Sequence, residues 1–144
     1  MHQVSRENAE KQLELLLDYY EIELEKRLKS DDAEKAQAVA DSVQDILIRA
    51  ITKGRLEIDE DPEDGGIRII QTLRRPVGEV SQIRYYEVTG RARTAIKDVE
   101  KGSIYNKMYS LLSAVSKQPI VVFHRMGGVD LTTAETLFTV FSLV

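Results

Sequence analysis

Cysteine and tryptophan are both absent from this chain of 144 residues, and only two histidines are present. Without cysteine the chain can form no disulfide, no thiolate zinc site and no cysteine nucleophile, and it fits a reducing compartment such as the cytoplasm. His2 lies near the chain end, and His124 has no second His, Asp or Glu at ligand spacing. We therefore expect neither histidine to act as a catalytic base, and we predict no metal site.

Long hydrophobic runs are missing as well. No apolar stretch approaches the roughly 18 residues needed to cross a bilayer. The polar, mixed-charge start MHQVSRENAEKQ does not have the pattern of a signal peptide. With 42% apolar and 31% charged residues, the chain has the composition of a globular protein. Its length suits a single domain over 1–144 with a real core, and we expect no membrane association.

Catalytic motifs are the third absence. The serines show no nucleophile-elbow pattern, and the glycine pairs at 65–66 and 127–128 match no phosphate-cradling motif. The acidic stretch at 59–65 fails as a calcium loop, because Asp64 stands where glycine is needed and Ile70 where the bidentate Glu belongs. We interpret that stretch as a solvated turn. The sequence thus predicts a protein that is not an enzyme and needs no cofactor.

Charge is unevenly distributed along the chain, although the net charge is only −4. Residues 1–66 contain nine Lys or Arg and eighteen Asp or Glu, whereas residues 67–117 contain ten basic and four acidic residues. Acidic and basic faces could meet within one fold or between subunits. Two solvated faces of opposite sign are the simpler interpretation.

Helical periodicity dominates residues 4–53. An apolar stripe with Leu13, Leu16 and Leu24 predicts a first helix over 4–29 with Ser5 as its N-cap. A second helix is predicted from a capping box at Asp31 and Glu34 to Lys53, with Gly54 as its C-terminal cap. The short connection favours an antiparallel αα-hairpin over an intermolecular coiled coil. The apolar face of residues 13–28 is wide, so we also expect homo-oligomers.

A period of two follows in residues 54–88. Segments 55–59 and 67–73 alternate and predict a β-hairpin, which Pro76 and Gly78 end, and the segment 83–88 predicts a third antiparallel strand.

Helical signals return in residues 89–144. We predict helices over 91–99, from a Ser103 cap through 115, over 119–126 and from about Thr133 to the end. A strand over 119–126 is the alternative. In the second of these helices the residues predicted to share the inner face are Ile104, Met108, Leu111, Leu112 and Val115. The last helix is predicted to begin with a capping box at Thr132 and Glu135. The fold class is therefore α+β and mainly helical, with an N-terminal αα-hairpin, a small antiparallel sheet and C-terminal helices.

The last helix is the main candidate for a partner-binding surface. Its segment LTTAETLFTVFSLV contains one charged residue and ends the chain on apolar side chains. The four candidate contact residues are Leu137, Phe138, Phe141 and Val144. The alternative is a core helix, in which Leu137 and Phe141 share an inner stripe with Ala134. Phe138 then borders the exposed side.

A possible basic surface is the second candidate. Its residues are Arg74, Arg75, Arg84, Arg91 and Arg93, and they lie near two tyrosines, as in a stacking platform for single-stranded nucleic acid. The sequence pI near 5.3 and the common packing of Arg stems over sheets argue against this interpretation. We therefore do not favour a nucleic-acid partner.

Residues 56–144 resemble the tail assembly chaperones of tailed bacteriophages. The resemblance rests on the order and spacing of four segments: IRIIQTLRRPVG, IRYYEVTGRARTAI, YNKMYSLLSAVSKQP and VVFHRMGGVDLTTAETLFTVF. These correspond to a strand pair with a basic-Pro turn, a strand leading into a helix, a helix ending at a Pro break, and an apolar segment, an Asp and a last apolar helix. The helical segment 4–53 departs from the pattern, since many such proteins lack it.

The resemblance implies a function without catalysis or cofactor. Proteins of this family coat the aggregation-prone tape-measure protein and recruit tail-tube subunits around it, in the cytoplasm of the bacterial host. The family pattern marks structure, so it assigns no individual contact residues. The alternatives are a structural virion or morphogenesis component, such as a connector or completion protein, and after it a nucleic-acid-binding regulator.

Overall fold

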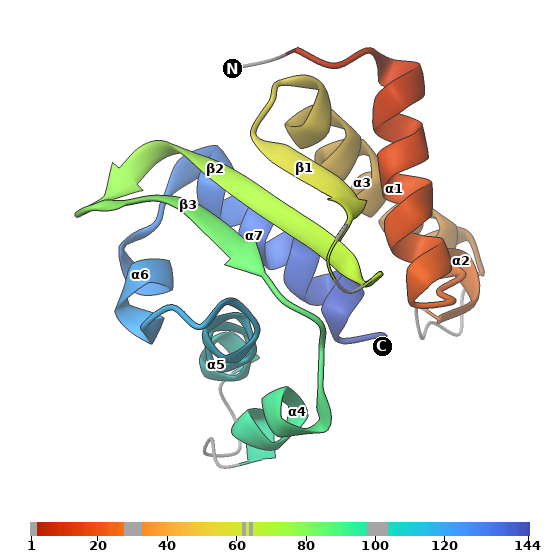
Figure 1. The fold of residues 1–144 in the computed structure, drawn as a ribbon. Helices are drawn as coiled ribbons and strands as arrows, with labels where there is room; N and C mark the ends of the chain where they lie inside the picture. The colour runs from red at the N-terminus through yellow and green to blue at the C-terminus, as the bar shows by residue number, and fades with distance from the viewer. Residues whose placement is uncertain (1–2, 28–32, 62, 64, 98–103) are drawn as a thin grey trace.

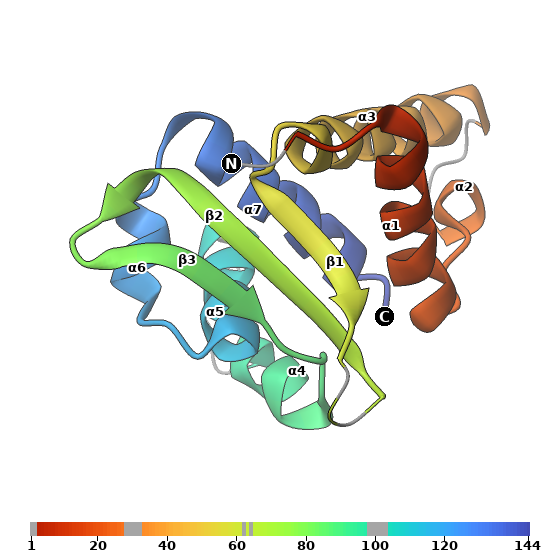
Figure 2. The ribbon, with the colours of Figure 1, turned by 45° about the horizontal axis from the view of Figure 1, so that its top comes forward.

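A three-stranded antiparallel sheet in the order β1-β2-β3 lies at the centre of the fold, and helices pack on one face and along both edges (Figures 1 and 2). The computed structural model describes residues 3–27, 33–61, 63, 65–97 and 104–144. The strands are β1 (Leu56–Glu60), β2 (Ile67–Val77) and β3 (Val80–Tyr85). This arrangement confirms the predicted mainly helical α+β class.

Alternation along the strands separates a buried face from a solvent-facing one. Ile58, Ile69 and Tyr85 are aligned across the three strands and are all buried. The opposite face is polar, and its Arg68 lies 3.5 Å from the Asp59 carboxylate. β2 is longer than predicted, because it continues through Pro76 at its end and turns into β3 at Gly78, where φ is +58°. The third strand was also misplaced, since it covers 80–85 rather than 83–88.

The N-terminal helical segment is present, but the predicted single helix over 4–29 is wrong. It is divided into α1 (Arg6–Tyr19) and α2 (Leu24–Arg27), with Glu21 between them at a φ of +54°. The break turns the chain so that Ile22 and Leu24 enter the core, a tertiary gain that outweighs the cost of one left-handed residue. The predicted Ser5 N-cap is confirmed, since Ser5 Oγ accepts from the Asn8 N–H at 3.2 Å.

Helix α3 (Ala33–Thr52) completes this segment, and Gly54, two residues after its end, has a φ of +75°, which confirms the predicted cap. Asp31 of the predicted capping box lies outside the described residues. Figures 1 and 2 show α3 crossing α1 steeply rather than running alongside it. Because α1 packs on both α3 and β1, much of its apolar stripe is covered within the chain.

The C-terminal half is helical, as predicted. Its helices are α4 (Gly90–Lys97), α5 (Ile104–Ser116), α6 (Ile120–Arg125) and α7 (Gly128–Phe141). The structure confirms the choice of a helix over a strand for 119–126, and the predicted Ser103 cap lies outside the described residues. None of the described helices is both long and apolar enough to span a membrane.

The start of α7 differs from the prediction. The helix begins at Gly128, about five residues before the predicted start near Thr133, and Gly127 is its N-cap. Thr132 therefore lies inside the helix, where its Oγ1 donates to the Gly128 carbonyl at 3.2 Å. The proposed capping box at Thr132 and Glu135 is wrong. Residues 128–131 become helical because Asp130 is held by β2, as described below.

Helix α7 lies behind the sheet, between α3 and α5 (Figures 1 and 2), and contacts both helices and β2. Its position explains why this segment is nearly uncharged. A helix with neighbours on three sides needs apolar or small side chains around most of its circumference.

Candidate functional site

The four candidate contact residues of α7 do not share one surface. Leu137 and Phe141 are 0% and 1% exposed, and the Phe141 ring lies 5.8 Å from the ring of Tyr85, centroid to centroid. Both residues belong to the core and present no surface to a partner. Phe138 and Val144 are half-buried and pack at the margin of the core. Only these two remain available for contact with another protein.

Asp130 fixes the N-terminal end of α7 against β2. β2 extends beyond β1, which begins at Leu56 opposite Gln71. The backbone N–H groups of Arg74 and Arg75 therefore have no strand partner, and they donate to the two Asp130 carboxylate oxygens at 2.9 and 3.0 Å. Asp130 is 2% exposed. The carboxylate takes the place of a missing strand and so has a structural role.

A buried polar chain continues from Asp130 into the sheet. The Gln71 side-chain amide donates to the Asp130 carbonyl at 2.9 Å, and the Tyr85 hydroxyl donates to Gln71 Oε1 at 2.6 Å. Burial, and next the charge of Asp130, raise the pKa of the Tyr85 hydroxyl well above its ordinary value. Tyr85 therefore stays protonated and keeps donating. These groups join the helix to the sheet.

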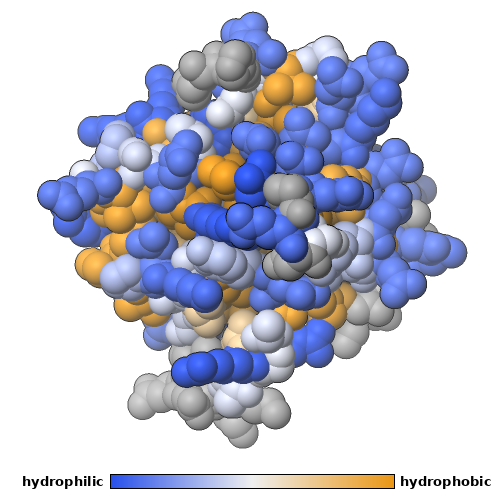
Figure 3. Space-filling model, viewed as in Figure 1, coloured by the Kyte–Doolittle hydropathy of each residue, from blue (hydrophilic) through white to orange (hydrophobic). Residues whose placement is uncertain are grey.

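An exposed apolar surface lies instead on α5 and α6. We define the α5–α6 surface as Tyr105, Tyr109, Ile120, Val121 and His124. Tyr105 is 58% exposed and Val121 is 51% exposed. The Tyr105 and Tyr109 rings lie 6.4 Å apart, and Tyr109 meets the His124 ring edge-on at 5.3 Å. In Figure 3 hydrophobic atoms are visible over the position of α6.

Helix geometry makes this surface continuous. Ile120 and Val121 are four and three residues before His124, so they share its side of α6. Tyr109 is four residues after Tyr105 and shares its side of α5. The contact between Tyr109 and His124 then joins the two helices.

The α5–α6 surface also approaches α7. Helix α7 contacts α5, and partial burial, followed by the charge of Glu135 on α7, raises the pKa of the Tyr109 hydroxyl. Phe138 is three residues after Glu135 and lies on the same side of α7. Phe138 is half-buried at the margin of the core.

Sequence reasoning missed most of this surface. It assigned Ile104 to the inner face of α5, but Ile104 is 64% exposed, so that assignment is wrong. One signal was available in residues 120–123. Four consecutive apolar residues on a helix cover about 300° of its circumference, so they cannot all face one core. Val122 and Phe123 are buried, and Ile120 and Val121 are left outside.

The five residues of the possible basic surface are not brought together. Arg84 lies on β3, where its Nη2 donates to Asp61 Oδ2 at 2.7 Å and its guanidinium stacks 4.7 Å from the Tyr86 ring centroid. Arg91 and Arg93 lie on α4. Arg74 and Arg75 lie near the opposite end of the sheet, beside Asp130. No single strip for a nucleic-acid strand results from these positions.

The acidic turn after β1 is structural. Asp61 is buried, and its carboxylate accepts from the Glu63 N–H at 3.0 Å as well as from Arg84. These two hydrogen bonds, the backbone one first, lower the pKa of Asp61. The interpretation of a fully solvated turn is wrong for this residue. Within the described ranges no group of three or more His, Asp or Glu could hold a metal ion.

Comparison with protein-family models, curated proteins and solved structures gives no match to this chain.

Proposed function

We propose that this chain is a non-enzymatic tail assembly chaperone of a tailed bacteriophage or prophage. In this proposal it binds the tape-measure protein and recruits tail-tube subunits around it, in the cytoplasm of a bacterial host. The observation that carries the proposal is the α5–α6 surface, an exposed apolar area within residues 56–144, which are the ones that resemble that family.

The chemistry of this surface suits an apolar protein client. Contiguous exposed apolar side chains mark interaction sites, because leaving them in water is unfavourable. Tyrosine adds a large, rigid contact area with a polar tip, and it is enriched where proteins bind each other. Tyr105 and Tyr109 provide such contacts beside the aliphatic Val121. A tape-measure helix with an apolar stripe would cover these residues and be kept from aggregating.

A capture experiment tests the proposal. The chain is coexpressed with the tape-measure protein of the same genome, and the soluble fraction of that protein is measured together with the amount that copurifies. We expect Tyr105→Asp combined with Val121→Asp to weaken capture by about thirtyfold or more, since central contact residues contribute about 2 kcal/mol or more. The fold should persist, because both side chains are exposed.

Val39→Asp is the matched control. Val39 is an exposed apolar residue on α3. Its replacement by Asp introduces the same kind of charge, but outside the α5–α6 surface. Capture by this variant should equal that of the wild type. Wild-type binding by the double variant, or no effect of the wild-type chain on tape-measure solubility, would contradict the proposal.

We also propose that the chain forms homo-oligomers. The wide apolar face of residues 13–28, which first suggested this, supports it less than expected. Leu13, Leu16 and Leu24 of the N-terminal stripe are buried within the chain. The α5–α6 surface is therefore the better candidate for contact between copies. We expect sedimentation velocity at high micromolar concentration to show species larger than a monomer for the wild type. Val121→Asp should shift them toward monomer, and a wild type that sediments only as a monomer would refute the expectation.

A further inference from the structure

A pocket beside the N-terminal end of α7 is lined mainly by cationic side chains. It has a volume of about 480 Å³. Its lining residues are Gln3, Arg49, Lys53, Arg55, Arg74 and Val129. The four cations come from α3, from the turn between α3 and β1, and from β2. No carboxylate lines this pocket, so its cations have no acidic neighbour across the cavity.

Arg55 is the least ordinary of these cations, because it is only 9% exposed. Its Nη1 donates to the neutral Thr133 hydroxyl oxygen at 3.3 Å. In the described part of the chain no carboxylate lies within ion-pair distance of Arg55, Arg49 or Arg74. A buried guanidinium that forms no ion pair is costly to the folded state.

Electrostatics around Arg55 agree with this geometry. Burial lowers the pKa of its guanidinium, Asp130 opposes that effect, and the charges of Arg74 and Arg49 add to the lowering. Asp130 thus supplies a counter-charge to Arg55, although no ion pair joins the two side chains and both Asp130 oxygens accept from backbone N–H groups. One carboxylate near Arg55 does not balance the four cations that line the pocket, so the pocket keeps a positive charge.

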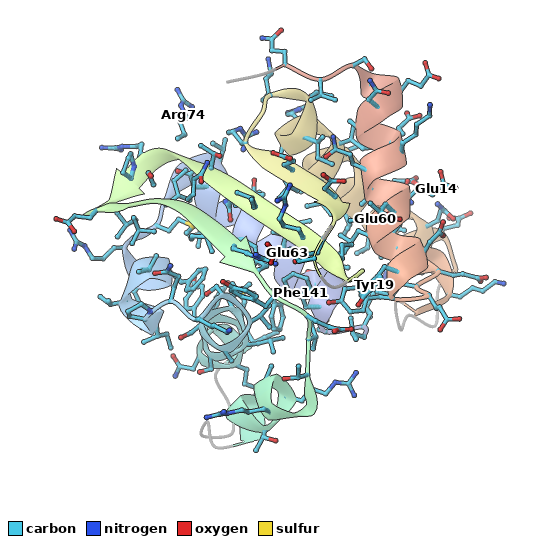
Figure 4. The ribbon with its side chains drawn as sticks, viewed as in Figure 1. Glu14, Tyr19, Glu60, Glu63, Arg74 and Phe141 are labelled. Carbon is cyan, nitrogen blue, oxygen red and sulfur yellow. The ribbon has the colours of Figure 1, made fainter. Side chains whose placement is uncertain are left out.

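Two neighbouring pockets define the extent of the cationic site. One pocket of about 500 Å³ shares Arg74 and Val129 with it, and adds Arg75, Arg125 and the carboxylate of Asp130. The other, of about 510 Å³, shares Arg49 and Arg55 but is also lined by Asp41 and Asp45. These carboxylates repel an anion. The favourable region for an anion is therefore the pocket between these two, which no carboxylate lines, and one of its residues, Arg74, points outward in Figure 4.

We propose that this cationic pocket binds a small anion through a phosphate group. Arg and Lys donors that converge from three elements match the several oxygens of a phosphate, and each guanidinium can donate two hydrogen bonds. A compact anion is favoured over a nucleic-acid strand, because Arg84, Arg91 and Arg93 lie outside this pocket. The site shares no residue with the α5–α6 surface and does not depend on the chaperone proposal.

Calorimetric titration tests the site with two probes, inorganic diphosphate and ADP, at low ionic strength. Diphosphate should bind at one site and raise the melting temperature of the wild type. Arg49→Glu and Arg74→Glu should each weaken binding about tenfold or more, because each removes a charge-assisted hydrogen bond. Tighter binding of ADP than of diphosphate would assign the phosphate to a nucleoside-bearing ligand, and weaker binding would assign it to a free anion.

Arg55→Met separates binding from folding. It removes the buried charge and keeps an apolar side chain of similar length, and Thr133 Oγ1 still donates to the Val129 carbonyl at 2.8 Å. We expect this variant to fold and to melt at the same temperature with and without diphosphate. Arg93→Glu, an exposed residue of α4, is the control and should respond to diphosphate as the wild type does.

Three results would overturn the proposal. The first is the absence of both heat and thermal stabilisation when diphosphate is added to the wild type. The second is undiminished diphosphate binding by Arg49→Glu and Arg74→Glu. The third is binding of single-stranded oligodeoxythymidine that Arg49→Glu, Arg74→Glu and Arg93→Glu all weaken alike, since that would indicate a diffuse basic surface instead of a pocket.

Discussion

Replacing Asp130 by alanine is expected to lower the free energy of unfolding by about 3–6 kcal/mol. The carboxylate accepts two backbone hydrogen bonds, from Arg74 and Arg75, and is almost fully buried. A hydrogen bond to a charged group contributes about 1.5–3 kcal/mol, and its loss leaves a backbone N–H without a partner. Because domains are stable by only about 5–15 kcal/mol, this single change should make the fold marginal.

Urea denaturation followed by circular dichroism measures this effect. Asp130→Asn retains one side-chain acceptor for the two donors, so its loss of stability should fall between alanine and the wild type. Asp45→Ala is the matched control, because Asp45 is an exposed carboxylate on α3, and it should change stability by no more than about 0.5 kcal/mol. An Asp130→Ala variant as stable as Asp45→Ala would show that the carboxylate does not hold α7 against β2.

Phe141 and Phe138 should respond very differently to substitution, although they are three residues apart on one helix. Phe141 is 1% exposed and packs against Tyr85, so Phe141→Ala should cost about 3–5 kcal/mol. Phe141→Asp should unfold the chain, since it also buries an unpaired charge. Phe138 is half-buried at the margin of the core. Phe138→Asp should therefore leave the fold intact while it weakens capture of an apolar client.

Thermal melts of the two aspartate variants distinguish a partner surface from a helix that is entirely core. A folded Phe138→Asp beside an unfolded Phe141→Asp is the expected outcome. Equal and severe unfolding of both variants would mean that α7 serves only the core. The surface for a client would then be restricted to α5 and α6.

Local signals determined the elements of this fold from the sequence alone. Alternation of apolar residues placed the centre of β2 around Ile69, a side-chain oxygen at Ser5 marked the start of α1, and Gly54 marked the end of α3. Each of these features depends on residues within a few positions of one another. A helix cap or a strand period has the same physical cause in any fold, which is why these predictions were correct.

Only the tertiary structure decided the boundaries and the sites. Glu21 takes a positive φ because Ile22 and Leu24 gain a core that α3 provides. Helix α7 starts early because Asp130 binds β2, which lies 55 residues earlier in the sequence at Arg75. These outcomes depend on contacts between distant segments, and such contacts leave no periodic pattern in a single sequence.

The candidate sites were the least predictable part for the same reason. The sequence correctly indicated that the C-terminal half is rich in apolar helices, but it could not say which sides of those helices meet. Leu137 is buried because α7 has neighbours on several sides, whereas Val121 is exposed because α6 is covered on one side only. Likewise, no linear motif contains Arg49, Arg55 and Arg74. Only folding brings these three side chains to one pocket. Composition supplied the apolar and cationic side chains, and the packing of helices on the sheet decided which of them face the core and which face a partner or a ligand.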